Sequence, residues 1–325
     1  MSMVIPLLQL TILLLVTANP ACAQEFFAFG GLMRDRETHE RSYSWQLDYR
    51  EGIGEHFAYS IAYLNEGHVP SHHRDGHTMQ LWARSDLLSS RLSLAAGIGP
   101  FFYFDTVPAK EGASYTNTHG WGGILSMSAT WYTESRWLLQ LRTNFVETGS
   151  SINTFSTLLG IGYQLEAPPA AGSQPVAHEQ TDKTANELTF FFGKTIVNSL
   201  SSDESYASSI EYRRRLWRYV DGTAAWLYEG DNRLARRNGL ATQLWAVKEF
   251  LDDQVALGIG GGAYFSIDDH GHAQQHGNHN PSGIVTLTAT YRFAPPWNIR
   301  ASWHRIVTNY DADADVILGG IGYRF

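Results

Sequence analysis

Large apolar side chains alternate with small or polar ones along most of this chain. In the segment 317–325 the odd-numbered positions are mostly bulky and apolar, such as Ile317 and Ile321, whereas positions 320 and 322 are glycine. Segments 92–105 and 297–304 show the same period of two, which predicts β-strands. A bulky apolar face opposite a small or polar face is typical of a membrane β-barrel with lipid outside and a filled interior.

The alternating segments recur eight times in each half of the chain. In the second half they are predicted to start near Glu187, Ser205, Trp217, Gly239, Gln254, Gly283, Trp297 and Asp315. The predicted connections alternate in length: they are tight near 52–54, 88–90 and 134–136, and longer and polar over 67–76 and 106–120. Short periplasmic turns and long external loops are typical of outer-membrane barrels.

The two halves are copies of one unit. Segment 43–105 aligns without a gap on 206–268, so that positions 80–83 and 243–246 both read Gln-Leu-Trp-Ala. The match resumes at an offset of 160 residues, with Gly-Ile-Gly-Tyr ending each copy. The predicted organisation is therefore a β-barrel repeat over 24–166, a Pro/Ala-rich periplasmic linker over 167–185 and a second β-barrel repeat over 186–325.

Two arrangements of these strands are open. The linker and the self-contained copies favour an all-β fold of two tandem eight-stranded antiparallel transmembrane barrels, each filled by its own side chains. The alternative is one sixteen-stranded barrel, which would leave an aqueous channel and act as a porin. That barrel requires segments 160–165 and 188–196 to pair across the two copies.

The first 23 residues are predicted to be a signal peptide. Val4 to Val16 form its apolar core, and Ala21-Cys22-Ala23 matches a cleavage site, so the exported chain would lack cysteine. At the other end, Tyr323-Arg324-Phe325 resembles the signal that outer-membrane proteins present to the barrel-assembly machinery. The predicted location is the outer membrane of a Gram-negative cell envelope, among lipids and lipopolysaccharide. The formal net charge of −8 gives no basic footprint for nucleic acid.

The order of segments resembles the eight-stranded lipid A deacylases of the PagL type. The resemblance lies in Ala-Gly-Ile-Gly at 96–99 and in Arg142 or Arg300 of the penultimate segment of each copy. It implies a barrel at whose lipid-facing surface a His-x-Ser pair hydrolyses an acyl ester.

That catalytic pair is not matched. Segment 142–146 of the first copy has neither His nor Ser, and the second copy has them in reverse order as Ser302 and His304. Residues two apart share a face of a strand, and this face lies opposite Trp303, which predicts an interior position. We therefore expect a non-catalytic barrel with a structural, partner-binding or surface-polymer accessory role. A lipid A deacylase-like esterase using Ser302 and His304 is the alternative.

Polar groups recur near the external ends of both copies. An acidic residue, a basic residue and a second acidic residue are predicted to lie on the inward face there: Glu66, Arg74 and Asp105 in the first copy, and Glu229, Arg237 and Asp268 in the second. They predict either a ligand site at the barrel mouth or ion pairs that neutralise one another inside a filled barrel.

The chain has 13 histidines, and several are expected in external loops. Neutral imidazoles at such spacings ligate zinc, copper or nickel. A divalent metal is therefore the one cofactor that the sequence suggests, and solvated or lipopolysaccharide-contacting histidines are the alternative. The candidate ligands are His68, His72, His73 and His77 in the first copy and His270, His272, His276 and His279 in the second.

Overall fold

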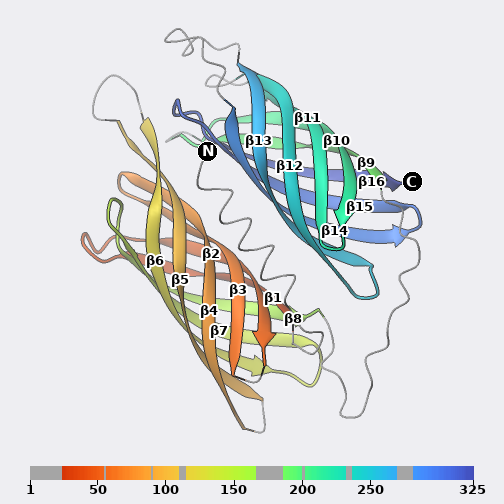
Figure 1. Cartoon of the computed structure of the whole chain (residues 1–325). Coiled ribbons are helices and arrows are strands. Elements are labelled where there is room, and N and C mark those ends of the chain that lie inside the picture. The colour runs from red at the N-terminus through yellow and green to blue at the C-terminus, as the bar shows by residue number, and fades with distance from the viewer. Residues whose placement is uncertain are drawn as a thin grey trace. The chain divides into compact units, whose positions relative to one another are not determined.

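The chain forms two compact units, each a closed eight-stranded antiparallel barrel (Figure 1). The structure is a computed structural model that describes residues 24–54, 56–88, 91–109, 115–165, 186–199, 202–231, 236–268 and 281–325. The predicted signal peptide and linker lie outside these residues. Among the residues that are described, no helix is long and apolar enough to cross a membrane.

The strands of each barrel follow one another in chain order around the wall. The first barrel contains β1 (Gln24–Asp35), β2 (Arg41–Ile53), β3 (Phe57–Val69), β4 (His72–Leu87), β5 (Leu92–Pro108), β6 (Tyr115–Tyr132), β7 (Trp137–Thr148) and β8 (Thr154–Gln164). The second contains β9 (Asn186–Val197), β10 (Glu204–Trp217), β11 (Val220–Asp231), β12 (Arg236–Phe250), β13 (Val255–Asp268), β14 (Ser282–Ala294), β15 (Trp297–Val307) and β16 (Ala314–Arg324).

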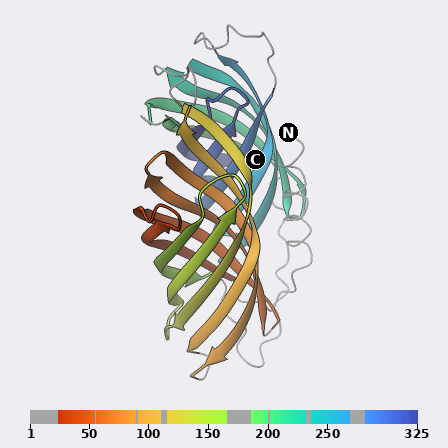
Figure 2. The ribbon, with the colours of Figure 1, turned by 90° about the vertical axis from the view of Figure 1, so that its left-hand side faces the viewer.

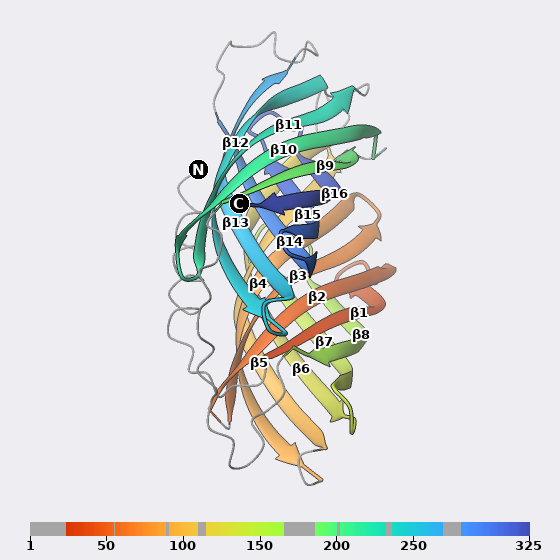
Figure 3. The same ribbon diagram turned by 90° about the vertical axis from the view of Figure 1, so that its right-hand side faces the viewer.

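Each barrel closes between its own first and last strands. Phe29 of β1 pairs with Gly160 of β8, and the matching residue Phe191 of β9 pairs with Gly320 of β16 (Figure 3). The prediction of two eight-stranded barrels is confirmed. The sixteen-stranded alternative is wrong, because β8 pairs with β1 and β9 pairs with β16, so β8 and β9 do not pair with each other. We call the end where the first strand begins and the last strand ends the terminal end, and the opposite end the loop end.

Bulky apolar side chains point outward, as the alternation predicted. Ile317 and Ile321 are 51% and 55% exposed, whereas their neighbours Val316 and Leu318 are buried inside. Aromatic rings lie on the outer surface at the terminal end of both barrels, where Trp137 packs edge-on against Tyr163 and Trp297 against Tyr323.

The two barrels have the same register around a buried tryptophan. Trp82 pairs with Ala58 and Gly97, and Trp245 pairs with the matching residues Asp221 and Gly260. Each indole N–H donates a hydrogen bond of 2.9 Å to a hydroxyl on the neighbouring strand. The glycines leave space for the rings, since a Cβ on Gly97 would lie 2.4 Å from the indole.

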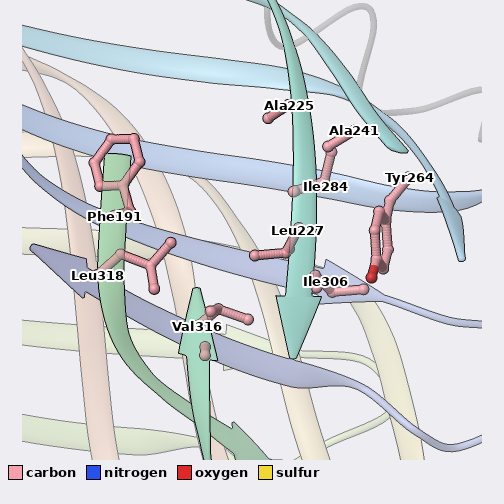
Figure 4. Packing of buried hydrophobic residues seen from close by; sticks show 10 residues of the cluster. Phe191, Ala225, Leu227, Ala241, Tyr264, Ile284, Ile306, Val316 and Leu318 are labelled. Atoms are coloured by element: carbon pink, nitrogen blue, oxygen red, sulfur yellow. The ribbon is translucent and has the colours of Figure 1, made fainter. Parts of the chain in front are cut away.

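Apolar side chains also fill part of each interior. In the second barrel, Phe191, Leu227, Ile284, Val316 and Leu318 belong to one buried cluster contributed by strands from all around the wall (Figure 4). A corresponding cluster in the first barrel includes Phe27, Phe29, Leu64 and Phe101. The interior is therefore packed with side chains, as expected for a barrel of eight strands.

The connections predicted as long loops are mostly strand. Segment 67–76 contains the end of β3 and the start of β4, and segment 106–120 contains the end of β5 and the start of β6. The long orange and yellow strands β4, β5 and β6 are seen most easily in Figure 2. Sequence reasoning ended these strands too early because their outer parts are polar, whereas backbone pairing continues there irrespective of polarity.

One predicted strand boundary in the second barrel is also displaced. Trp217 was expected to start a strand but ends β10, and β11 begins at Val220. Trp217 pairs directly with Val220 across the hairpin, so the tight turn is 218–219.

Candidate functional site

A β-bulge brings the first candidate carboxylate into the barrel. The register of β3 and β4 shifts between Asn65 and His68, where Gly67 has a φ of +67°. A Cβ at Gly67 would lie 2.4 Å from the Tyr43 carbonyl oxygen, so only glycine fits there. The extra residue directs Glu66 inward, where it is fully buried. Gly230 makes the matching bulge beside Glu229, with a φ of +86°.

Glu66 and Arg74 form a buried ion pair near the loop end of the first barrel. The Arg74 Nε donates to Glu66 Oε2 at 2.5 Å, and neither side chain is more than 1% exposed. Arg74 also donates to Thr154 Oγ1 at 3.0 Å and to the Ile152 carbonyl oxygen, and the Thr154 hydroxyl donates to Glu66. The pair therefore joins β3 and β4 to β8 across the interior.

The second barrel repeats this arrangement. The Arg237 Nη2 donates to Glu229 Oε2 at 2.6 Å, and its Nη1 donates to the Ala312 carbonyl oxygen at 2.6 Å. Ala312 is the counterpart of Ile152, so the same backbone position accepts from the same arginine in both copies. In each barrel the glutamate and the arginine neutralise each other. The arginine also links its own strand to the chain at the start of the last strand, on the other side of the interior.

Asp105 has different partners at the mouth of the first barrel. Its Oδ2 accepts a hydrogen bond of 2.7 Å from Ser151 and lies 2.7 Å from His72 Nδ1. His72 is the first of 16 residues in β4, at the loop end and beyond the roughly 10 residues that a membrane-spanning strand needs. The hydrogen bond with Asp105 raises the pKa of His72 above its ordinary value of 6.5. The structure does not describe the side chain of the matching Asp268.

The four described candidate metal ligands lie on β3 and β4, not in a loop as predicted. The rings of His68 and His73 are 3.7 Å apart between centroids, whereas His72 contacts Asp105. His77 is buried against Tyr63. In the described part of the chain, no group of three or more His, Cys, Asp or Glu side chains is arranged to hold a metal ion. His270, His272, His276 and His279 lie outside that part.

Ser302 and His304 both point into the second barrel. They are 5% and 7% exposed, in agreement with the predicted parity. His304 Nδ1 lies 2.8 Å from Thr286 Oγ1, and Ser302 Oγ lies 3.3 Å from Thr288 Oγ1. No hydrogen bond joins Ser302 to His304 among the described residues, and an acyl chain in surrounding lipid would have to cross the barrel wall to reach them.

Sequence reasoning missed a second charged layer, nearer the terminal end of each barrel. In the first barrel Arg142 donates to Asp48 at 2.5 Å, and both side chains are completely buried. The guanidinium carbon of Arg142 lies 4.4 Å from the Phe29 ring centroid, and that of Arg50 lies 4.2 Å from the Trp82 ring centroid. The signal was available, because the acid-Tyr-Arg triplet of residues 48–50 recurs at 211–213.

The matching layer of the second barrel is more densely charged. Arg300 donates to Glu211 at 2.7 Å and also to Glu187, and Arg213 lies 4.2 Å from the Trp245 ring centroid. Arg213 also approaches Asp221 at 3.6 Å, where the first copy has Ala58. The layer therefore extends further towards the terminal end than in the first barrel.

Comparisons with known proteins give fold-level similarity only. No protein-family model matches the chain, and no curated protein matches it in sequence. The N-terminal β-barrel domain of Pseudomonas aeruginosa OprF is 11% identical, with a TM-score of 0.35, over 43% of this chain and 96% of that one. Neisserial surface protein A is 12% identical, with a TM-score of 0.34, over 44% and 97%. The β domain of the Bordetella autotransporter BrkA is 9% identical, with a TM-score of 0.25, over 94% and 100%. Scores this low establish neither a relationship nor a shared activity.

Proposed function

We propose that the protein is an outer-membrane protein made of two tandem filled barrels, with a structural or partner-binding role and no catalytic role. One observation carries this proposal: each barrel is closed, apolar on its outer surface and packed inside with side chains that include buried ion pairs. Such a barrel is stable in lipid and has no open channel. In this topology the terminal ends face the periplasm and the loop ends face outside.

The membrane part of the proposal is tested by a charge on the outer surface. Leu159, near the middle of β8, is 67% exposed, and Leu88, in the turn after β4, is 63% exposed. If β8 faces lipid, Leu159→Arg should destabilise the folded barrel in bilayers by about 2–4 kcal/mol, and the control Leu88→Arg by less than about 1 kcal/mol. Urea titration in lipid vesicles, read by heat-modifiable migration, measures both. Equal effects would refute a lipid-facing β8.

The absence of a channel is tested in planar bilayers. Because eight strands enclose only enough space for side chains, the folded chain should give no sustained single-channel current. Steady conductance from protein shown to be folded by heat-modifiable migration would contradict the filled-barrel proposal.

The non-catalytic part is tested by mass spectrometry of lipid A from cells that express the protein. We expect the acyl pattern to be the same with the wild-type chain, with Ser302→Ala and without the protein. Loss of an acyl chain that Ser302→Ala abolishes would instead support the PagL-type esterase. Folding of both chains is checked first, so that an unchanged pattern is informative.

A further inference from the structure

A recess opens at the terminal end of the second barrel, among arginine side chains. Its volume is about 400 Å³, with the open solvent at its mouth included. Five arginines line it, and they come from β10, β14, β15 and β16: Arg213, Arg215, Arg292, Arg300 and Arg324. Two carboxylates, Glu187 and Asp221, also line it.

The first barrel shows why the second has a recess. Tyr132 of the first copy is replaced by Arg292 at the matching position. The Tyr132 hydroxyl donates to Glu25 at 2.7 Å, so its ring occupies the terminal end of that interior. Arg292 turns instead to Glu249, at 2.7 Å, and to the Asp253 carbonyl oxygen, at 2.5 Å. The space that the tyrosine ring fills in the first barrel is left open in the second.

Three further arginines at this end are specific to the second copy. Arg300 replaces Gln140, Arg215 replaces Gly52, and Arg324 replaces Gln164. Arg215 is paired, because it contacts Glu249 at 2.9 Å and Asp221 at 3.5 Å. Arg324 forms no ion pair or side-chain hydrogen bond among the described residues, and Glu187 and Glu249 attract its charge only from a longer distance.

The charges of the cluster leave one cation in excess. The carboxylates that pair with the other four arginines are Glu187, Glu211, Asp221 and Glu249. Five guanidiniums thus lie among four carboxylates, and Arg324, which Glu187 and Glu249 attract without forming an ion pair, carries the charge in excess.

Buried donors point to the same conclusion. Arg213 Nη2 and Arg292 Nε are buried, and neither has a hydrogen-bond partner in the described structure. A buried N–H group without a partner costs about 1–3 kcal/mol, and more when it is charged. Both donors belong to arginines that line the recess, so an acceptor placed there would meet unused donors and an uncompensated charge.

We propose that this recess binds a small, multiply charged oxyanion of the phosphate class. Guanidinium groups present planar pairs of donors that match phosphate oxygens. In the orientation proposed above, the recess faces the periplasm. Anion binding requires only the folded second barrel. It can therefore be confirmed or refuted whether or not the chain inserts into a membrane or has a catalytic role.

The experiment is a titration of the refolded full-length chain in detergent with inorganic phosphate, at low ionic strength, by isothermal calorimetry. Two variants install the residues of the first barrel at matching positions: Arg324→Gln and Arg292→Tyr. Gln164→Ala, in the first barrel, is the control. We expect one saturable site, about tenfold weaker binding in Arg324→Gln, no binding in Arg292→Tyr, and no change in the control.

A second readout separates binding from misfolding. Phosphate that binds only the folded second barrel should raise its urea midpoint and leave that of the first barrel unchanged. Heat-modifiable migration confirms that each variant has folded. Three results would overturn the proposal: binding that does not saturate, binding that both variants leave unchanged, or acetate binding as tightly as phosphate.

Discussion

The buried pair of Asp48 and Arg142 should be a main determinant of the stability of the first barrel. Both side chains are completely buried, and Arg142 also donates to Gln140 at 3.0 Å. Replacing Arg142 by methionine keeps much of the volume and removes the charge. Asp48 then remains in the interior without its ion-pair partner, and Arg50 already lies over Trp82.

The expected loss follows from these contacts. Removing one partner of a buried ion pair costs about 3–5 kcal/mol, because the remaining charge is neither hydrated nor paired. The guanidinium of Arg142 also lies over Phe29 at 4.4 Å and over Trp82 at 4.9 Å, and losing these contacts adds about 1 kcal/mol. The double variant Asp48→Leu/Arg142→Met removes both charges and should recover most of the loss.

The assay is urea unfolding with brief proteolysis at each concentration, followed by mass spectrometry of peptides from β7 and β15. These peptides report the two barrels separately. The midpoint of the first barrel should fall in Arg142→Met and largely recover in the double variant, while that of the second barrel stays constant. A loss below about 1 kcal/mol, or a double variant no more stable than the single one, would refute the claim that charge pairing stabilises the interior.

Three further predictions follow from the geometry. Gly97→Ala should destabilise the first barrel by about 1–3 kcal/mol, because the new methyl group meets the Trp82 ring, whereas Gly123→Ala, with no atom within 4 Å of its Cβ, should be nearly neutral in the same urea assay. The pKa of His72, measured by NMR, should lie above 6.5 and fall in Asp105→Asn. The contribution of that contact to stability is therefore present below pH 6.5 and lost as the pH rises through the higher folded-state pKa; an unchanged pKa in the variant would contradict the assignment. Cleavage of the chain between the barrels should leave both folded, because every strand pairs within its own barrel, and unfolding of either would count against this independence.

Which side chains point into the barrel and which point outward was predictable, because the geometry of a strand determines it. Successive residues of a strand point to opposite faces, so the alternation around Ile317 and the inward position of Ser302 and His304 could be read directly from residue order. The duplication was equally predictable, because the two copies keep the same residues at matching positions. Trp82 faces Gly97 in the first copy, and Trp245 faces Gly260 in the second.

The ion-pair partners were not predictable, because they come from strands far apart in the chain. Asp48 and Arg142 are 94 residues apart and meet only when the barrel is closed. The Glu66 bulge was hidden for a different reason: segment 67–76 was predicted to be a polar loop, whereas the backbone uses the positive φ of Gly67 within a continuing strand.

The sequence by itself therefore determined the strand content, the inward and outward faces and the two copies, since each depends on local periodicity. The tertiary structure alone decided that closure occurs at eight strands, because closure depends on which edges pair: β8 with β1, and β16 with β9. It also decided which charges neutralise one another and where a cation is left over. The arginine recess exists because Arg292 turns away from a space that Tyr132 fills in the other barrel, and side-chain direction of this kind is set by neighbours across the interior.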